Sequence, residues 1–308
     1  MTHEFMQVDA FTTQPLGGNP CAIIFDADDL STETMQAIAQ ENNLSETAFV
    51  LKSDVADVAA RYFTPQEEIP MAGHPTIATI YALATSGKLP QDKIGKPGTT
   101  TQIRLQLRAG VLPIDIVWST ATGPNQAAGV DSVIMAQLAP NFGQTYAAQS
   151  IMPIFGLQPE DVLPNAPIQV VSTGTPQLMI PVRDHNVLRR VDINAAQYVA
   201  LRKRENFFSP HLFCLDGATD AGDTFARHVV AAASGSFEDP FTGSATGGMG
   251  AYLWHHGLID SSTFIAEQGH WMGRPGQATV EIVGQPNAIE TIKVGGSAAA
   301  VIHGTLLI

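Results

Sequence analysis

The sequence predicts an α+β protein built from two homologous halves, and two observations carry this prediction. A segment from Glu68 to Gly87 recurs without a gap as Glu238 to Gly257. A single repeat at such a distance is typical of a domain duplication, because solenoid arrays repeat every few tens of residues. Runs with strand-like alternation also outnumber segments with helical periodicity. Strand-rich halves with few helices indicate α+β rather than a doubly wound sheet.

The length and composition set the bounds of this prediction. The chain has 308 residues, 44% of them hydrophobic, which is enough for two cores. Its formal charge of −13 makes nucleic acid and anionic membranes poor partners. Cys21 and Cys214 lack metal-ligand spacing and are expected in the core. The segment Met1–Met6 does not resemble a signal peptide and no apolar run suits a membrane span, so a cytoplasmic protein is predicted.

The repeat extends beyond the helix segments. Gly18–Asp28 resembles Gly174–Asp184, and Arg108–Ile116 resembles Arg274–Ile282, in the same order in both halves. We therefore predict an N-terminal repeat domain over residues 1–120 and a C-terminal repeat domain over 121–295. A tail over 296–308 is compatible with a return to the first domain. The identities within the duplicated segment are Glu68/Glu238, Pro70/Pro240, Gly73/Gly243, Thr76/Thr246, Leu83/Leu253 and Gly87/Gly257.

Strands and surface helices follow from local patterns. Ser31 is a candidate cap for a helix that contains Met35 and Ile38, and a second surface helix is predicted over Val191–Leu201. Thr120–Asn165, with scattered glycine and proline, is predicted to connect the halves. The predicted strands are Val8–Thr12, Cys21–Phe25, Thr47–Leu51, Ala59–Phe63, Thr101–Arg108, Leu112–Trp118, Ile168–Ser172, Leu178–Val182, Leu212–Leu215, Phe225–Ala231, Ala278–Val283 and Thr291–Val294.

The repeated helix is predicted to be buried in each half. Pro75–Ser86 is apolar or small on nearly every side, and Ala245–His256 contains glycines that an exposed helix would tolerate badly. Gly87 and Gly257 suit the left-handed position that ends a helix. Each half is thus predicted to be a curved, mostly antiparallel, barrel-like sheet wrapped round one central helix.

The start of each central helix is a candidate anion site. Gly73 precedes His74, and Gly243 precedes Ser244, at a point where several backbone N–H groups lack partners within the helix. These donors and the helix dipole favour a carboxylate. If the halves face each other, both helix starts would open onto one cleft.

Four ordered motifs resemble the PhzF-like proteins of phenazine biosynthesis and their relatives, which share the diaminopimelate epimerase fold. The motifs read VDAFTTQPLGGNPCAI, NNLSETAFV, PMAGHPT and EDPFTGSATG, and they span nearly the whole chain at Val8–Ile23, Asn42–Val50, Pro70–Thr76 and Glu238–Gly247. The resemblance implies a cofactor-free isomerase or epimerase with its site between two homologous domains. Its substrate would be a small carboxylate, cyclic or amino-acid-like.

The resemblance also implies catalytic residues. The acid/base glutamate of the family falls on Glu46, and the other catalytic positions fall on His74, Asp239 and Ser244. Related epimerases have two cysteines before the glycines of the two turns, where this chain has Ala72 and Thr242. A carboxylate rather than a pair of thiols is therefore expected to carry the proton. The residues expected to bind the substrate are Gly73, Gly243, Asn19, Thr76 and Thr246.

Local sequence supports part of this assignment. Glu46 precedes the apolar run Thr47–Leu51, where burial would raise its pKa toward neutrality. In the second half Pro210 aligns with it, so a second carboxylate is not expected. His74 and Asp239 have structural alternatives, as a core histidine and a turn cap, and Ser244 also suits a helix cap. Arg108 and Arg274 fit either a carboxylate site or a turn.

Other classes of function fit the sequence less well. The adjacent His255 and His256 lack the spacing of a metal hydrolase, and no metal is expected. The stretch TGSAT lacks the first glycine of a serine hydrolase motif. The remaining alternative is a protein of the same fold that binds a small carboxylate without turnover. The strand-rich edges are compatible with a homodimer.

Overall fold

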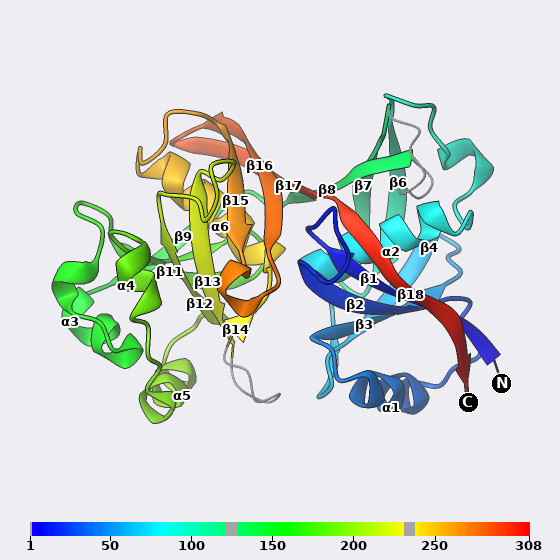
Figure 1. Ribbon diagram of the computed structural model, residues 1–308, viewed down its shortest axis with the longest axis horizontal. Coiled ribbons are helices and arrows are strands. Elements are labelled where there is room, and N and C mark those ends of the chain that lie inside the picture. The colour runs from blue at the N-terminus through cyan, green and yellow to red at the C-terminus, as the bar shows by residue number, and fades with distance from the viewer. Residues whose placement is uncertain (1, 121–128, 231–237) are drawn as a thin grey trace. The chain divides into compact units, whose positions relative to one another are not determined.

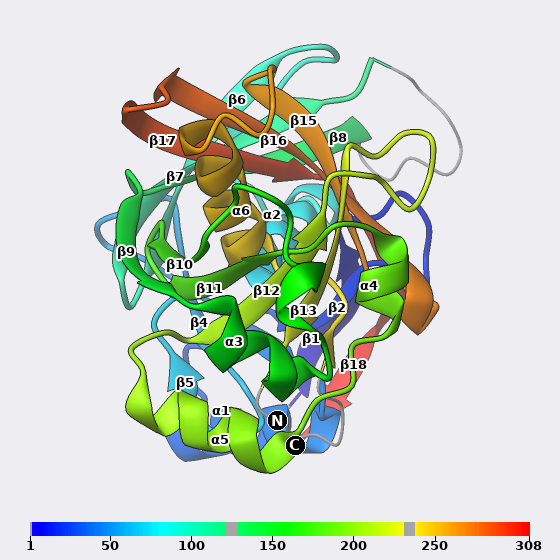
Figure 2. The same ribbon diagram turned by 90° about the vertical axis from the view of Figure 1, so that its left-hand side faces the viewer.

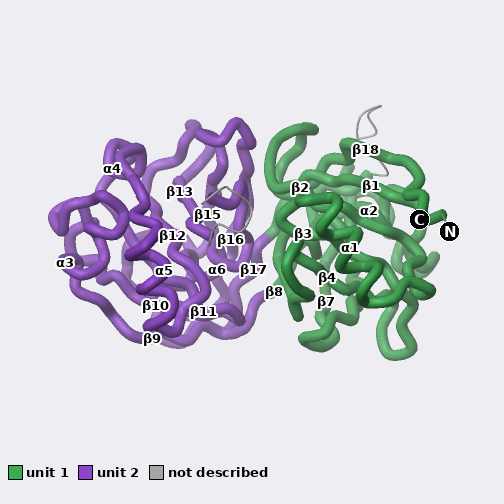
Figure 3. The backbone as a smooth tube through the Cα atoms, turned by 90° about the horizontal axis from the view of Figure 1, so that it is seen from below, with its two compact units in different colours: residues 1–136, 295–308 green, residues 137–294 purple. Residues whose placement is uncertain are grey.

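The computed structural model describes residues 2–120, 129–230 and 238–308. The chain divides into two compact units, coloured separately in Figure 3: unit 1 comprises residues 1–136 and 295–308, and unit 2 comprises residues 137–294. The predicted boundary after residue 120 adjoins residues 121–128, which lie outside the described residues. The C-terminal residues belong to the first unit.

Among its described residues, unit 1 contains a strand-rich framework with two α-helices. The C-terminal strand β18 pairs antiparallel with β1, as the red and blue ribbons of Figure 1 show, and β1 also pairs with β2. The elements are β1 (Thr2–Ala10), β2 (Asn19–Ile24), α1 (Thr32–Asn42), β3 (Glu46–Leu51), β4 (Val58–Phe63), β5 (Glu68–Ile69), α2 (Gly73–Thr85), β6 (Thr100–Leu107), β7 (Gly110–Trp118), β8 (Val130–Gln137) and β18 (Ala298–Leu307).

Unit 2 repeats this arrangement with more surface helices. The elements are β9 (Asn141–Tyr146), α3 (Ala148–Ile151), β10 (Ile168–Ser172), β11 (Pro176–Pro181), α4 (His185–Arg189), α5 (Ala195–Arg204), β12 (Ser209–Cys214), β13 (Thr224–Val229), β14 (Glu238–Asp239), α6 (Gly243–His255), β15 (Thr263–Gln268), β16 (Gly276–Gln285) and β17 (Ala288–Gly296). The predicted α+β class is confirmed.

The pairing pattern explains why each unit has a central helix. Most strand pairs are antiparallel, but β4 runs parallel to β6 and β13 runs parallel to β15. Parallel strands need a crossover connection, and α2 and α6 lie within these two crossovers. The other parallel pairs, β2–β3 and β11–β12, enclose the surface helices α1 and α4–α5. The same connections therefore occur in both units.

Both central helices are buried, as predicted. In α2 every residue but Thr85 is buried, and the helix packs against β1, β2, β3 and β18. The helix α6 packs against β10, β11 and β16, which surround it in Figure 2. A Cβ atom at Gly248 would lie 2.8 Å from Met179 Cε, and one at Gly250 would lie 2.8 Å from Val280 Cγ1. The glycines thus allow the sheet to approach α6 closely.

The helix ends confirm part of the sequence reading and correct part of it. Gly87 and Gly257 have φ of +68° and +64°. The N–H groups of Lys88 and Leu258 bond back to Leu83 and Leu253, which completes a Schellman motif in each unit. The predicted helix starts at Pro75 and Ala245 were wrong, because both helices begin two residues earlier, at Gly73 and Gly243.

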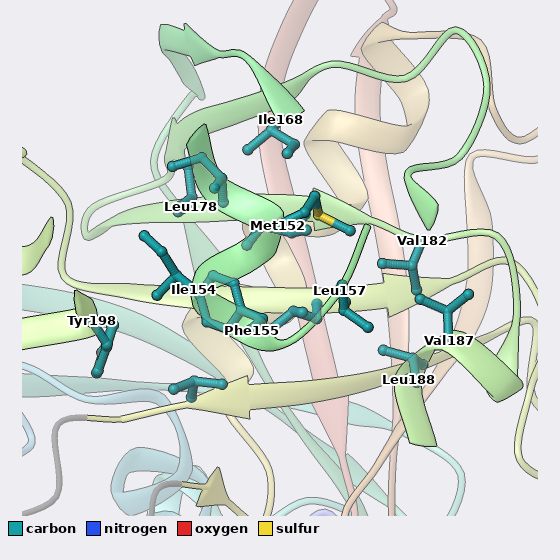
Figure 4. Close-up of a cluster of buried hydrophobic side chains, with 14 of the residues drawn as sticks. Met152, Ile154, Phe155, Leu157, Ile168, Leu178, Val182, Val187, Leu188 and Tyr198 are labelled. Atoms are coloured by element: carbon teal, nitrogen blue, oxygen red, sulfur yellow. The ribbon is translucent and has the colours of Figure 1, made fainter. Parts of the chain in front are cut away.

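In each unit, a cluster of apolar residues covers the outer face of several strands. In unit 1, α1 contributes Met35 and Ile38 to a cluster with Phe49 and Phe63, and Ser31 caps this helix as predicted. Figure 4 shows the larger cluster of unit 2, where Met152, Phe155, Leu157, Ile168, Leu178, Val182, Leu188 and Tyr198 pack together. The predicted helix Val191–Leu201 starts later, at Ala195, because Asn194 caps it. The strands that carry these residues are therefore covered by apolar side chains on this outer face.

Candidate active site

Glu46 is the first residue of β3, beside the parallel strand β2. The register places Glu46 opposite Cys21. Because side chains alternate along a strand, Phe49 faces the outer cluster and Glu46 faces the central helix α2. The Glu46 side chain is 17% exposed. A carboxylate is thus placed at the mouth of an apolar strand, as the sequence predicts.

His74, the second residue of α2, contacts this carboxylate. Its Nε2 atom lies 3.2 Å from Glu46 Oε2, and the imidazole is 6% exposed. On the other side of the ring, His74 Nδ1 lies 3.2 Å from the Nδ2 atom of Asn19, the first residue of β2. Three sequence-predicted residues of unit 1 therefore lie next to one another, with His74 and Asn19 buried and Glu46 partly exposed.

Burial controls the protonation of the groups around Glu46. It lowers the pKa of His74 to about 3, against a smaller opposing effect of a backbone hydrogen bond with Pro20. The imidazole is therefore neutral at physiological pH. Burial, and then the nearby charge of Glu46, raise the pKa of the Cys21 thiol well above its ordinary value. Cys21 stays a thiol, and both cysteines are buried and not disulfide-bonded.

The remaining predicted residues of unit 1 lie in the first turns of α2. Gly73 is the first helical residue, and its neighbour Ala72 has no side chain that could cap the helix. Thr76 is fully buried, and its Oγ1 atom donates to the Ala72 carbonyl at 2.8 Å. Tyr62 Oη lies 3.0 Å from the same hydroxyl, and burial raises the pKa of Tyr62. The turn that carries His74 is thus tied to β4.

In unit 2, Asp239 and Ser244 flank the start of α6. Thr242 is the residue that precedes the helix, so the alternative in which Ser244 caps it was wrong. Thr242 Oγ1 donates to Asp239 Oδ2. Gln268, which sequence reasoning missed, accepts from the Thr242 N–H at 3.3 Å and donates to the Asp239 carbonyl at 2.7 Å. Two strand segments therefore fix the turn before Gly243.

Thr246 and Arg108 have contacts within their own units. Thr246 is buried, and its hydroxyl donates to the Thr242 carbonyl at 3.0 Å, as Thr76 does to Ala72. Arg108 is mostly exposed, with Nη1 3.6 Å from Glu68 Oε2. The roles expected for Asn19, Thr76 and Thr246 in substrate binding stay predictions.

The register also identifies the residue of unit 2 that corresponds to Glu46. Gln177 pairs with Ser209 between β11 and β12, as Cys21 pairs with Glu46 between β2 and β3. Ser209, and not Pro210, is therefore the equivalent position, and the alignment of Pro210 with Glu46 was wrong by one residue. Pro210 and Leu212 lie on the same face of β12, and the Leu212 side chain packs in the outer cluster. Aligning Pro210 with Glu46 would therefore place every β12 side chain on the wrong face of the strand.

Ser209 belongs to a buried network of neutral groups that sequence reasoning did not find. Ser209 Oγ donates to Gln177 Oε1 at 2.8 Å and lies 2.7 Å from His228 Nε2. His228 Nδ1 lies 3.2 Å from His211 Nδ1. Burial lowers the pKa of His211 to about 3 and that of His228 well below its ordinary value. All four side chains are buried and uncharged at neutral pH.

Within residues 2–120, 129–230 and 238–308, no group of three or more His, Cys, Asp or Glu side chains is placed to hold a metal ion. His255 contacts the Pro286 carbonyl, and His256 contacts the Gln169 side chain. In the same part of the chain, no helix has the length and apolarity needed to cross a bilayer.

Comparison with known proteins identifies the class. Residues 8–304 match the family model described as phenazine biosynthesis-like protein, PhzC-PhzF. The chain is 32% identical over 280 residues to a Bacillus subtilis protein named uncharacterized isomerase YfhB, covering 91% of this chain and 90% of that one. It is 29% identical over 308 residues to the trans-2,3-dihydro-3-hydroxyanthranilate isomerase of Pseudomonas fluorescens, covering 99% and 100% of the two chains.

A solved structure leads to the same class. The PhzF-family phenazine biosynthesis protein of Bacillus anthracis superposes with a TM-score of 0.85 at 33% identity, covering all of both chains. Fold and relatives together define an isomerase with a duplicated α+β architecture. The chain belongs to the phenazine biosynthesis-like (PhzC-PhzF) family.

Proposed function

We propose that the chain is a cofactor-independent isomerase that moves a proton between two carbons of a small carboxylate-bearing metabolite, with Glu46 as the proton carrier. The observation that carries this proposal is the contact of 3.2 Å between Glu46 Oε2 and His74 Nε2 at the start of α2. A carboxylate can take and return a proton, and a neutral imidazole beside it can hold its orientation without competing for that proton.

The proposed reaction is balanced without any added group. Glu46 removes a proton from a carbon that an adjacent unsaturated or carboxyl-bearing group makes acidic, and the electron pair delocalises into that group. Glu46 then delivers a proton to a second carbon, which restores the Glu46 carboxylate, and exchange of that proton with solvent before delivery lets deuterium enter the product. Carbon acids ionise only when the developing charge is stabilised, and backbone N–H groups at a helix start supply such stabilisation.

The relatives and the turns support the proposed substrate class. The Pseudomonas fluorescens relative is named for a cyclic carboxylate, which supports a cyclic or amino-acid-like acid as the substrate here. We propose that Asp239 and Ser244 contact the substrate, with Gly73 and Gly243 offering backbone donors. A homodimer and a cytoplasmic location remain parts of the proposal.

The proposal is tested by a metabolite screen scored by deuterium incorporation from heavy water. Glu46→Gln should lower turnover by about 10³-fold, because the amide keeps the shape but cannot carry a proton. Circular dichroism and ligand binding should be nearly unchanged. Wild-type activity in this variant would exclude Glu46 as the carrier. Ligand binding without exchange in the wild-type protein would instead support the alternative of a non-catalytic carboxylate-binding protein.

A further inference from the structure

The turn between β14 and α6 is held by the end of β15. Gln268, the last residue of β15, is 1% exposed, and its side chain reaches two backbone groups of the turn. Its Oε1 atom accepts from the Thr242 N–H at 3.3 Å, and its Nε2 atom donates to the Asp239 carbonyl at 2.7 Å. A Cβ atom at Gly269 would lie 2.5 Å from the Pro240 carbonyl oxygen. This close approach requires glycine, and the backbone of the turn is fixed on both sides of Pro240.

These contacts determine the direction of each hydrogen bond in the turn. A backbone N–H group can only donate and a carbonyl can only accept, so the Gln268 amide has one orientation. Its Nε2 atom also lies 3.5 Å from Thr242 Oγ1, to which it can donate its second hydrogen. The Thr242 hydroxyl then has its own hydrogen to give, and it donates to Asp239 Oδ2. The bonds therefore run in one direction, from Gln268 through Thr242 to the Asp239 carboxylate.

We propose that Thr242 is a positioning residue, whose hydroxyl holds the Asp239 carboxylate in the orientation that contacts the substrate. The inference rests on the proposed function, since it takes Asp239 as a substrate contact. The torsion that turns a carboxylate about its Cβ–Cγ bond is soft, and a bond to Oδ2 restricts it. A hydroxyl that donates to Oδ2 is compatible with an ionised Asp239, which can only accept hydrogen bonds from a substrate.

The Thr242 side chain does not cap the helix that it precedes. A threonine at this position commonly accepts a hydrogen bond from a backbone N–H group of the first helical turn. Thr242 forms no such bond, and Thr246 donates to its carbonyl rather than to its hydroxyl. Removal of the Thr242 hydroxyl therefore tests the contact with Asp239 without removing a helix cap.

Unit 1 builds the same turn without these three polar side chains. The alignment of the duplicated segments gives two of the equivalent residues. The third follows from the register, since the last residue of β15 pairs with the first residue of β16 as the last residue of β6 pairs with the first of β7. The equivalents of Asp239, Thr242 and Gln268 are Ile69, Ala72 and Leu107. The start of the central helix forms in both units, so the turn itself does not require the polar set.

A competing arrangement gives Thr242 a different role. If Asp239 were protonated on Oδ2 at neutral pH, it would donate to Thr242 Oγ1, and the hydroxyl would direct its own hydrogen elsewhere. Thr242 would then be available to contact the substrate itself. The protonation of Asp239 separates the two arrangements, and it can be measured in the resting protein.

The first experiment is ¹³C NMR of protein labelled at the aspartate Cγ atoms, with the Asp239 signal assigned by its loss in Asp239→Ala. We expect the shift of an ionised carboxylate at neutral pH in the wild type. Thr242→Val removes the hydroxyl at nearly the same shape and should move this signal, whereas Thr242→Ser keeps the hydroxyl and should leave it close to the wild-type position. Thr242→Ala, which gives unit 2 the residue that unit 1 has at Ala72, should act like Thr242→Val.

The second experiment is a double-mutant cycle on turnover. Thr242→Val should lower kcat/KM by about tenfold or more, because a hydrogen bond to a charged group is lost. Thr242→Ser should keep kcat/KM within about threefold of the wild type. In the Asp239→Ala background, Thr242→Val should change kcat/KM by less than about threefold, because the residue through which the hydroxyl acts is absent.

Unit 2 contains a matched control for both experiments. Thr219 Oγ1 donates to Glu267 Oε1 at 2.6 Å, which is the same kind of bond. Glu267 immediately precedes Gln268 on β15, so the two side chains lie on opposite faces of the strand. Thr219→Val should leave the Asp239 signal in place and change kcat/KM by less than about threefold.

Three results would overturn the proposal. The first is a protonated Asp239 in the wild type at neutral pH, and the second is an Asp239 signal that Thr242→Val does not move. The third is a loss of kcat/KM in Thr242→Val that is as large in the Asp239→Ala background as in the wild type. Because the NMR experiment uses no substrate, it tests the position of the carboxylate separately from the Glu46→Gln test of the proposed function.

Discussion

In unit 1, the first residue of β3 is Glu46, and its side chain contacts the start of α2. In unit 2, the equivalent residue is Ser209, the first residue of β12. Unit 1 places a carboxylate there beside one imidazole, at 3.2 Å. Unit 2 places a hydroxyl there, between Gln177 and His228. The buried central helices, their Schellman motifs and the parallel crossovers around them occur in both units. The fold thus accepts either a charged or a neutral polar group at this point.

The comparison between Glu46 and Ser209 concerns the free-energy cost of desolvating a charged side chain at this position. A buried carboxylate loses hydration, and only good contacts compensate for that loss. Unit 2 avoids this cost with a fully neutral network, which shows that the framework does not require a charge. The shared framework therefore does not require a carboxylate at this position, which agrees with the role in proton transfer proposed for Glu46.

The largest predicted difference between the units is their sensitivity to acid. In folded unit 2, burial keeps two histidines neutral, His211 and His228. In folded unit 1, burial keeps His74 neutral. Their folded pKa values lie below the unfolded value near 6.5. Stability is thus complete above pH 6.5 and decreases as the pH falls toward about 3. Each histidine contributes about 1.4 kcal/mol per pH unit, so unit 2 should lose about 2.7 kcal/mol per unit from these two.

Hydrogen exchange with mass spectrometry between pH 7 and 5 measures this slope for peptides of each unit. Most carboxylates titrate below that range, so the histidines dominate it. His211→Ala gives unit 2 the residue that unit 1 has at Ala48, and it should reduce the slope. Equal slopes in the two units would contradict the prediction.

A smaller effect is expected from removing the hydroxyl at the centre of the neutral network. Ser209→Ala leaves Gln177 Oε1 and His228 Nε2 without the bonds they make to Ser209 Oγ. We expect a loss of about 2–4 kcal/mol in the free energy of unfolding, because two buried polar groups lose a partner. Chemical denaturation measures it. Turnover at permissive temperature should change less than threefold, and a loss comparable to that of Glu46→Gln would place Ser209 in the reaction.

The smallest predicted changes in the free energy of unfolding should be equal in the two units. Arg61 and Glu68 form a two-bond ion pair at 2.8 Å for each bond, and Arg227 and Glu238 form its counterpart at 3.0 and 2.7 Å. Glu68→Gln and Glu238→Gln should each cost about 1–2 kcal/mol in unfolding free energy. A difference above about 2 kcal/mol between these variants, measured in parallel, would show that the two frameworks are not equivalent.

Much of the fold could be predicted from local sequence, because duplicated glycines and apolar helices are properties of short segments. Gly87 and Gly257 mark the helix ends because glycine readily adopts a positive φ. Ser31 marks a helix start because its side chain caps the helix. The helix start at Ala195 was missed because the cap at Asn194 was not recognised. Residues 129–146 were predicted as a connection but contain β8 and β9.

The candidate site was less predictable, since it depends on strand register. Glu46 and His74 came from motif resemblance, and their contact required the parallel pairing of β2 and β3. Ser209, His211 and His228 belong to no motif, and only the pairing of β11, β12 and β13 brings them together. Strand alternation over 209–213 could have shown that Ser209 and His211 share a face.

The return of the chain to unit 1 has a consequence for biogenesis. Strand β18 pairs along the whole of β1 and packs against α2, the helix that carries His74. Residues 295–308 are translated after all of unit 2, so a ribosome-bound nascent chain has a full set of unit 2 strands before β1 acquires this partner. During synthesis, the edge of β1 that β18 covers is therefore exposed until the C-terminal residues emerge, and an open strand edge is prone to wrong pairing in that interval.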